Sequence, residues 1–347
     1  MAPMNTATSA PAAACDVEWA AGLLAQGCLV AFPTETVYGL GARADDDAAV
    51  ARIFQAKGRP SNHPLIVHVL DEADARVFAQ DLPDVALRLM RAFWPGPVTV
   101  IVPRRPGLAQ ASAGAQDSIG LRCPSHPVAR ALLERARALG VPGVAAPSAN
   151  RFGRVSPTAA AHVVQEFGPD MPVLDGGACA EGIESAIVDC TRGAPVLLRP
   201  GTVDRRALEA AAGQPLLERD AAAPRASGTL ASHYAPTARV RLVAHDGWDE
   251  ALRSRAMHPG LSGALALYSK ACPPGVQGQA VEWMAMPPTP AAVAHELFAV
   301  LRELDAKVQA GGGGEIWVEQ PPHEAAWDGV RDRLTRAAAD MDHGATS

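Results

Sequence analysis

The sequence predicts an α/β protein made of two domains joined by a linker. Short apolar runs alternate with segments of helical spacing from residue 17 to residue 206, the pattern of a layered α/β domain. A stretch without periodicity follows, and a second alternation begins at residue 238. The predicted layout is a disordered tail at 1–15, a first domain at 16–206, a linker or lid at 207–237 and a smaller domain at 238–343.

The first domain is expected to contain both strands and helices. Strands are expected at residues 28–33, 64–69, 98–102, 118–123, 144–147, 183–190 and 196–199. Helical spacing covers residues 47–56, 83–93, 127–139 and 157–167. Ser156 followed by Pro157 predicts a helix start, with Ser as N-cap and Pro at the first helical position. The alternation alone leaves open whether the sheet is parallel or mixed.

The linker and the second domain have a simpler pattern. After one short helix beyond residue 206, small residues without periodicity continue to about residue 236, as is typical of linkers. The segment SHYAP at 232–236 is unusually specific for a spacer. Beyond it, strands are expected at 239–244, 263–269 and 315–319, a long helix at 290–309 with Thr289 as N-cap, and a final helix at 325–339. These elements indicate a smaller α/β domain.

The composition is that of an ordinary globular protein. Hydrophobic residues make up 48% of the 347 residues, and no apolar run approaches the ~20 residues of a membrane helix. A formal net charge of −6 argues against a surface that binds nucleic acid throughout, but it leaves room for a local basic cleft. The six cysteines lack any C-x-x-C pair. Free thiols and a cytoplasmic location are therefore expected.

Polar side chains gather where the first strand ends. The segment TETVY at 34–38 places hydroxyl and carboxylate groups where a connecting loop would more often use Gly, Asn, Asp or Ser. Lys57 and Arg59 follow at the end of the next helix. Only three of the 31 basic residues are lysines. This lysine beside an arginine therefore suggests a compact ammonium charge next to a planar guanidinium group. That pair suits a polyphosphate, or a phosphate together with a carboxylate.

Other polar side chains lie at the ends of further strands. Arg122 and Arg199 each close an apolar run, the turn APSAN at 146–150 adds a hydroxyl and an amide, and GIES at 182–185 adds a carboxylate and a hydroxyl. Each feature alone is more often structural than functional. Together, at the strand ends where open α/β sheets bind ligands, they indicate a polar anionic ligand. The chain has neither a G-x-S-x-G nucleophile motif nor a P-loop.

These segments resemble the YrdC family in its long, two-domain form. The matching pieces of the first domain, in family order, are PTETVYGLG (33–41), KGRPSNHPLIVHV (57–69), SIGLRCPSHP (118–127), APSANRFGRVSPT (146–158), LDGGACAEGIESAIVD (174–189) and LLRPG (197–201). The linker contains the HYAP signature of the long form, and LFAVLRELD (297–305) and DRLTRAA (332–338) resemble the family's tail. The resemblance implies a twisted, largely mixed sheet in the first domain and a smaller, Rossmann-like second domain.

The resemblance also implies a reaction, that of a threonylcarbamoyl-AMP synthase. L-threonine, bicarbonate or CO2, and ATP with Mg²⁺ would give threonylcarbamoyl-adenylate and pyrophosphate. A separate transferase complex would then use the product to modify an adenosine in tRNA, so that direct tRNA contact is not required. Positioning and charge stabilisation would supply most of the catalysis.

Site residues carry over from the family motifs. Catalytic roles fall to Lys57 and Arg59, which would neutralise the triphosphate. The L-threonine site would comprise Thr36, His68, Arg122 and Ser185. The nucleotide site would comprise Arg59, His63, Ser118, Ser148, Asn150, Ser156, Arg199 and Tyr234. No protein ligand is assigned to the metal, because the ATP phosphates would hold most of the Mg²⁺.

The linker suggests a lid, and two alternative functions stay open. Small residues at 226–228 would let SHYAP fold over the pocket, so that Tyr234 covers the nucleotide and excludes water from an easily hydrolysed mixed anhydride. An RNA-binding module with the same cleft and no catalysis is the first alternative. A carbamoyl-transfer protein with another acceptor is the second, although such proteins carry zinc-finger modules and this chain has no C-x-x-C pattern.

Overall fold

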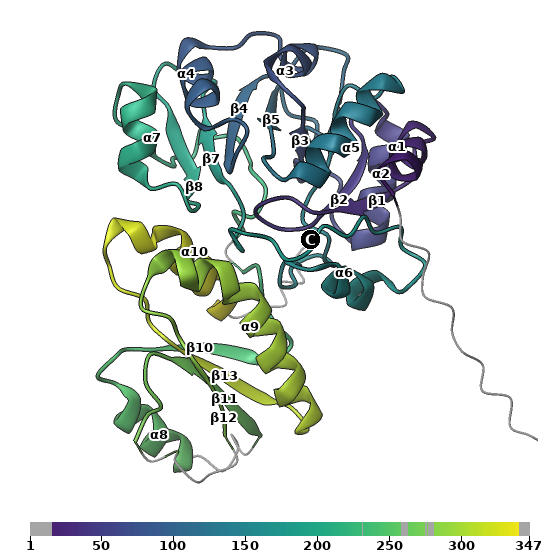
Figure 1. The fold of residues 1–347 in the computed structure, drawn as a ribbon. Coiled ribbons are helices and arrows are strands. Elements are labelled where there is room, and N and C mark those ends of the chain that lie inside the picture. The colour runs from purple at the N-terminus through teal and green to yellow at the C-terminus, as the bar shows by residue number, and fades with distance from the viewer. Residues whose placement is uncertain (1–15, 231, 258–262, 275, 277–280, 340–347) are drawn as a thin grey trace, which may run out of the picture.

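The first domain is built on a mixed, twisted sheet (Figure 1). The computed structural model describes residues 16–230, 232–257, 263–274, 276 and 281–339. Across the described sheet the strands run in the order β1 (Val30–Phe32), β2 (Gly39–Arg43), β6 (Val144–Ala145), β3 (Ile66–His68), β5 (Ser118–Arg122), β4 (Val98–Pro103), β7 (Ala186–Asp189), β8 (Val196–Arg199) and β9 (Leu217–Glu218). β3 pairs with β5 in parallel, whereas β4 pairs with β5 antiparallel. The predicted mixed sheet is therefore confirmed.

Alternation along the strands separates a core face from a site face. On β5, Ile119 and Leu121 enter the main core, so Ser118, Gly120 and Arg122 point to the opposite face. The core face is covered by α2 (Asp47–Lys57), α3 (Glu72–Phe78), α4 (Asp84–Phe93) and α7 (Arg205–Ala212). The site face is covered at one end by α1 (Val17–Ala25) and α5 (Pro127–Ala138). At the other end, Ala223 and Ala226 of the linker cover it, and the pocket described below opens between these two covers.

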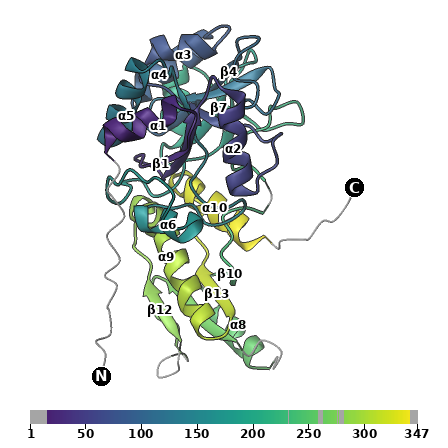
Figure 2. The ribbon, with the colours of Figure 1, turned by 90° about the vertical axis from the view of Figure 1, so that its right-hand side faces the viewer.

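The C-terminal domain is a parallel sheet with helices on both faces. The described strands run in the order β10 (Arg239–Val243), β13 (Gly314–Glu319), β11 (Ala264–Ser269) and β12 (Glu282–Ala285), all paired in parallel. One face packs on α9 (Pro290–Ala310) and α10 (Asp328–Ala338), and the other on α8 (Trp248–Ala256). In Figures 1 and 2, α10 lies where the two domains meet. The predicted second α/β domain is confirmed.

Several predicted elements differ from the structure. The sequence analysis did not identify α1, α3, α8, β2, β9 or β12 as elements; β2, β9 and β12 are short strands of two to five residues. Residues 1–15 and 340–343, predicted as tail and domain end, lie outside the described residues. The predicted N-cap Thr289 is confirmed, since its side chain accepts a hydrogen bond from the backbone N–H of Ala292.

The predicted helix start at Ser156 and Pro157 is wrong. The helix α6 (Ala160–Phe167) begins after Ala159, three residues later. The Ser156 hydroxyl donates instead to Glu184 (2.5 Å), and the Pro157 carbonyl accepts from the backbone N–H of Tyr38 (2.9 Å). These distant partners keep residues 156–158 out of the helix, although their local sequence favours a helix start.

Candidate active site

The loop after β1 folds around a threonine hydroxyl. Thr34 Oγ1 accepts hydrogen bonds from the backbone N–H groups of Thr36 and Val37 (both 3.2 Å). This turn presents Thr34 to a pocket on the site face, whereas Thr36, predicted as a threonine ligand, is fully buried beneath it and outside the lining. Tyr38 points away, and its hydroxyl donates to the Gly177 carbonyl (2.8 Å). Of the two threonines, Thr34 is therefore the one that a ligand would reach.

A buried ion pair positions Arg122 at the pocket. Arg122 Nη2 lies 2.6 Å from Glu35 Oε1, and the other Glu35 oxygen accepts from the Ser125 backbone N–H (3.0 Å). Burial works to raise the pKa of Glu35, but the guanidinium beside it holds that pKa below the ordinary value. Both side chains are thus charged. The carboxylate of Glu35, in the loop after β1, therefore holds Arg122 at the pocket wall.

Lys57 lies behind the pocket wall and Arg59 lies in it. The helix α2 ends with Gly58 in the left-handed conformation (φ 62°), which turns the two cations in different directions. Lys57 Nζ donates to the backbone carbonyls of Ser148 (2.6 Å) and Asn150. Burial, reinforced by Arg59, lowers the pKa of Lys57 well below its ordinary value. Burial lowers the pKa of Arg59 to about 10, and its Nε has no partner.

The turn at 146–150 is held from below. Ser148 lines the pocket while its carbonyl accepts from Lys57. The Asn150 amide donates to the carbonyls of Arg151 and Arg154 (both 2.8 Å), which fixes the turn, and its Oδ1 is buried without a partner. Lys57 and Asn150 therefore shape the wall that Ser148 presents to a ligand.

Arg199 and Glu184 form the opposite wall of the pocket. Arg199 Nε donates to the Ser185 carbonyl (3.0 Å) and Nη1 to the Ser227 carbonyl of the linker (3.0 Å). The Ser185 hydroxyl is already bonded to Thr99 (2.8 Å) and accepts from Arg199 (3.2 Å). Ser185 is therefore buried behind this wall and outside the lining, and its predicted role in the amino-acid pocket stays a prediction.

The linker closes the pocket with His233 and Tyr234. Tyr234 has a positive φ of 61°, and its hydroxyl donates to the Gly228 carbonyl (3.4 Å). A Cβ at Gly228 would lie 2.3 Å from that hydroxyl, so only glycine fits. The Tyr234 ring stacks on Phe298 of α9 at a centroid distance of 5.3 Å. Both domains thus hold the ring at the pocket.

The pocket is cationic and contains buried polar atoms without partners. Its empty space, including the part open to solvent, is about 460 Å³. Its cations are Arg59, Arg122 and Arg199, and its single carboxylate is Glu184. Burial, reinforced by Arg122, lowers the pKa of His68 to about 3, so His68 is neutral. His68 Nδ1, His233 Nδ1 and Arg59 Nε are buried here without partners, so a ligand could bond to them.

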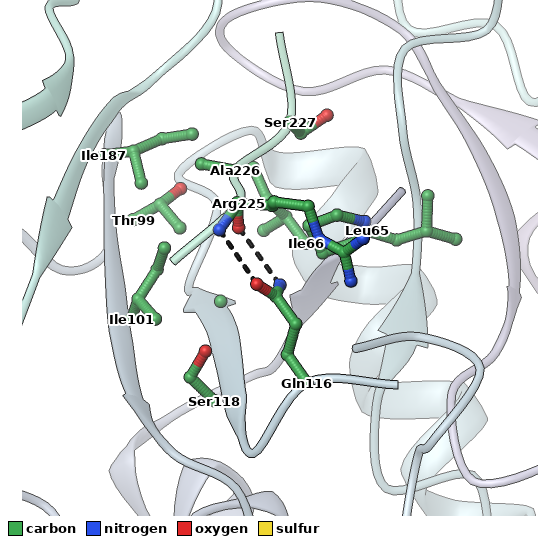
Figure 3. A pocket seen from close by; sticks show the side chains of 12 residues that line it. Leu65, Ile66, Thr99, Ile101, Gln116, Ser118, Ile187, Arg225, Ala226 and Ser227 are labelled. Atoms are coloured by element: carbon green, nitrogen blue, oxygen red, sulfur yellow. Dashed lines mark hydrogen bonds between the residues drawn. The ribbon is translucent and has the colours of Figure 1, made fainter. Parts of the chain in front are cut away.

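Two neighbouring pockets extend the main one. The first lies on the sheet between Ser118 and the linker (Figure 3), and there Gln116 pairs with both the N–H (2.8 Å) and the carbonyl (3.1 Å) of Arg225. The second contains His63, whose ring meets Phe152 edge to face at 5.4 Å. Linker residues line both of these pockets.

The structure brings the predicted residues together in part. Those lining the main pocket are Arg59, His68, Arg122, Ser148, Arg199 and Tyr234. His63 and Ser118 line the neighbouring pockets. Lys57, Asn150, Ser156, Thr36 and Ser185 support the walls from behind. Sequence reasoning missed Thr34, Glu184 and His233 as lining residues, although each stands inside a quoted motif. The binding roles of these residues stay predictions.

The fold and the pocket define a two-domain α/β protein whose cationic pocket is closed by its linker. Residues 22–201 match the Sua5_yciO_yrdC family model, described as telomere recombination. Residues 197–339 match the Sua5_C model, described as the C-terminal domain of threonylcarbamoyl-AMP synthase. The chain belongs to the Sua5–YciO–YrdC family, in the form that carries the Sua5 C-terminal domain, which confirms the predicted resemblance.

Curated relatives and solved structures agree with this assignment. Threonylcarbamoyl-AMP synthase of Pyrococcus abyssi is 42% identical over 65% of this chain and 68% of its own length. That of Bacillus subtilis is 42% identical over 64% of this chain and 65% of its own. The crystal structure of P. abyssi Sua5 complexed with L-threonine matches with a TM-score of 0.83 at 33% identity, over 93% of this chain and 94% of that one. Within the described residues, no helix is both long and apolar enough to span a membrane.

Proposed function

We propose that this chain is a threonylcarbamoyl-AMP synthase. It condenses L-threonine, bicarbonate or CO2, and ATP to threonylcarbamoyl-adenylate and pyrophosphate, which makes it a nucleotidyltransferase. The observation that carries the proposal is the closed pocket with three arginines, found in a chain whose relatives bear that name at 42% identity. P. abyssi Sua5, which shares the fold over nearly its whole length, has been solved with L-threonine.

The two substrates occupy opposite ends of the pocket in this proposal. Arg122 forks onto the threonine carboxylate, and Glu35 keeps the guanidinium in place without taking up all of its donors. Neutral His68 lies beside it, where an uncharged imidazole does not repel the threonine amine. Arg59 and Arg199 face the nucleotide phosphates and stabilise the charge that develops on the leaving pyrophosphate.

Lys57 acts on this reaction from behind the wall. Its Nζ donates to the Ser148 and Asn150 carbonyls and so fixes the turn that presents Ser148 to the nucleotide, and the family resemblance adds a share in neutralising the triphosphate. The linker helps to exclude water from the mixed anhydride, because the buried side chains of His233 and Tyr234 line the pocket. Tyr234→Ala should shorten the lifetime of the intermediate.

Mg²⁺ fits this donor set when it arrives with ATP. The one carboxylate of the pocket, Glu184, is already bonded to Ser156 and Arg333. Within the described residues, no group of three or more His, Cys, Asp or Glu side chains could hold a metal ion. We therefore assign most of the Mg²⁺ ligands to the ATP phosphates, whose negative charge the ion would neutralise.

A consumer of the product completes the proposal. The adenylate is an activated acyl donor, so a transferase complex that modifies an adenosine of tRNA would take it up. This step would take place in the cytoplasm, and it does not require this chain to contact the tRNA.

Pyrophosphate release tests the proposal. The purified protein should release pyrophosphate from Mg-ATP only with both L-threonine and bicarbonate. Lys57→Ala should lower kcat/KM by about 100-fold or more, the size expected for a lost charge at a phosphoryl transition state. Lys307→Ala is the matched control, because Lys307 pairs with Glu303 on the surface of α9.

Other outcomes would separate the alternatives. Release that is indifferent to threonine would indicate another acceptor. A folded protein that releases nothing with Mg²⁺ present, yet binds RNA with steep salt dependence, would favour the RNA-binding module.

A further inference from the structure

A buried arginine of the C-terminal domain reaches the pocket wall of the first domain. Arg333 lies on α10 and is 0% exposed. Its Nε donates to Glu184 Oε2 (2.8 Å) and its Nη2 to the Glu184 carbonyl (3.0 Å). Its Nη1 donates to the Pro200 carbonyl (2.9 Å) and to Asp332 (2.8 Å). All three guanidinium nitrogens are thus bonded, two of them to one residue of the other domain.

Glu184, the residue that Arg333 grips, is the carboxylate of the pocket. Its second oxygen accepts from Ser156 (2.5 Å), so both carboxylate oxygens have fixed partners. Burial works to raise the pKa of Glu184, but Arg333 and then Arg199 hold it below the ordinary value. A charged Glu184 balances the neighbouring Arg199 and sets the field that an anionic ligand meets.

Arg333 also contacts the tyrosine that closes the pocket. Its guanidinium carbon lies 5.4 Å from the Tyr234 ring centroid, within the range of a cation–π interaction. The same helix holds the preceding linker residues, because the His233 N–H donates to the Arg336 carbonyl (3.2 Å) and the Ser232 hydroxyl donates to the Ala339 carbonyl (3.3 Å). The last helix therefore fixes the closing segment of the linker.

We propose that Arg333 is a positioning residue for the pocket and acts through Glu184 and Tyr234. A fully buried arginine with this geometry orients one pocket carboxylate and one closing ring at the same time. The C-terminal domain thereby completes a site whose substrate-facing arginines all belong to the first domain. The inference rests on the proposed function only for its kinetic readout.

Domain docking alone would be a simpler role, and the chain offers a control for it. Arg302 on α9 also crosses between the domains, pairing with Glu166 (2.8 Å), the Val155 carbonyl and the Ser156 carbonyl (3.5 Å). None of these three residues lines the pocket, and Ser156 meets Glu184 through its hydroxyl, which Arg302 does not contact. Arg333→Met and Arg302→Met thus each remove an interdomain arginine. Arg333 is bonded to a residue that lines the pocket, whereas Arg302 is not.

Nucleotide binding and turnover measure the effect. For Arg333→Met we expect Kd and KM for ATP to rise about 10- to 100-fold, the size of a lost charge-assisted hydrogen bond at a ligand site, with a smaller change in kcat. Arg333→Lys keeps the charge without the fork and should fall between. Arg302→Met should leave Kd and KM unchanged. Equal effects in both Met variants, or none in folded Arg333→Met, would overturn the proposal.

Two further measurements keep the test independent of folding and of the reaction. If Arg333→Met does not fold, the double variant Arg333→Met/Glu184→Gln is measured instead. It lacks the unpaired buried carboxylate, and it is compared with Glu184→Gln alone. Trypsin cleavage after Arg225 reports linker closure without any substrate, and should be faster in each variant that lacks Arg333. Unchanged cleavage would show that the contact of Arg333 with Tyr234 does not hold the linker closed. Wild type that binds ATP but releases no pyrophosphate would refute the proposed function and leave this test intact.

Discussion

The two domains of this protein both bury polar side chains beside a sheet, but within the described residues only the first domain and its linker leave some of these atoms without hydrogen-bond partners. In the first domain, Arg59 Nε, His68 Nδ1 and His233 Nδ1 are buried at the pocket without partners. In the C-terminal domain, Glu319 closes β13, and its carboxylate is bonded to His245 Nδ1 and to the Lys270 N–H (both 3.0 Å). Within the described part of that domain, no buried side-chain nitrogen or oxygen lacks a partner.

This difference separates a ligand site from a structural cluster. Sequence patterns treat both alike, because each supplies polar residues after apolar runs. Hydrogen-bond satisfaction distinguishes them, since a buried group without a protein partner loses free energy until a ligand or water provides one. The polar residues of the C-terminal sheet stabilise that domain, whereas the partnerless atoms at the pocket are available for binding.

Replacing one arginine in each domain has the largest expected effect on this comparison. Arg59→Met removes an unpaired donor that faces the phosphates in the proposed reaction, so kcat/KM should fall by about 100-fold or more. Arg255→Met breaks the buried pair of Arg255 with Glu315 (2.5 Å) and should lower the free energy of unfolding by about 3 kcal/mol without changing kcat/KM. Pyrophosphate release and urea unfolding measure the two.

Either of two results would contradict this difference between the two domains. Loss of activity in Arg255→Met at a temperature where the variant is folded would mean that the C-terminal cluster also serves the site. A pure stability loss in Arg59→Met, with kinetics intact, would remove Arg59 from the binding surface.

The buried histidines of the pocket predict a pH dependence of stability. Burial lowers the pKa of both His68 and His233 to about 3, from an ordinary value of 6.5. Between these values the unfolded chain binds more protons than the folded one. The free energy of unfolding should therefore fall as the pH drops from about 6.5, by about 1.4 kcal/mol per pH unit for each histidine.

His68→Gln isolates one of these contributions. Urea unfolding between about pH 8 and pH 4.5 should give a slope smaller by about 1.4 kcal/mol per pH unit below pH 6.5. The reference is the region near pH 8, where His68 is neutral in both states. An unchanged slope would show that the His68 ring takes up protons in the folded protein, and the pocket would then be wetter than its geometry indicates.

Local patterns predicted much of the frame. The strand expected at residues 118–123 corresponds to β5, whose two-residue period places Ser118 and Arg122 on the face opposite the core. Helical spacing together with Thr289 as N-cap predicts the start of α9. Such features depend on neighbours within a few positions of the chain, which is why the sequence reveals them.

The pocket lining could not be predicted in the same way. The hydroxyl of Ser156 is bonded to Glu184, and Glu184 is bonded to Arg333, which lies 149 positions along the chain. Thr34 and Thr36 have the same side chain, and only the turn decides which of them reaches the pocket. Hydrogen bonds to distant residues and the local turn geometry decide whether a residue lines the pocket, and residue type alone does not. The motifs therefore located the site, whereas only the structure separated the lining residues from those that support the walls.

Gln116 tests the closing of the pocket from the first domain, with the smallest expected effect. Its amide pairs with the backbone N–H and carbonyl of Arg225, as one more strand residue would (Figure 3). Gln116→Ala should raise KM for ATP by about fivefold, since two neutral hydrogen bonds near solvent contribute about 1 kcal/mol in sum. Trypsin cleavage after Arg225 should become faster in parallel.

The matched control is Gln309→Ala in the C-terminal domain, where the amide meets Asp305 at 3.4 Å on the surface of α9. It should change neither KM nor cleavage. If Gln116→Ala speeds cleavage while KM stays fixed, the linker can open at Arg225 without disturbing the nucleotide, and closure then depends on the segment held by α10. If KM rises without faster cleavage, Gln116 contributes to the pocket floor rather than to linker docking. Either outcome would indicate that one domain alone closes the site. The hydrogen bonds that both domains make to the linker indicate instead that they close it together.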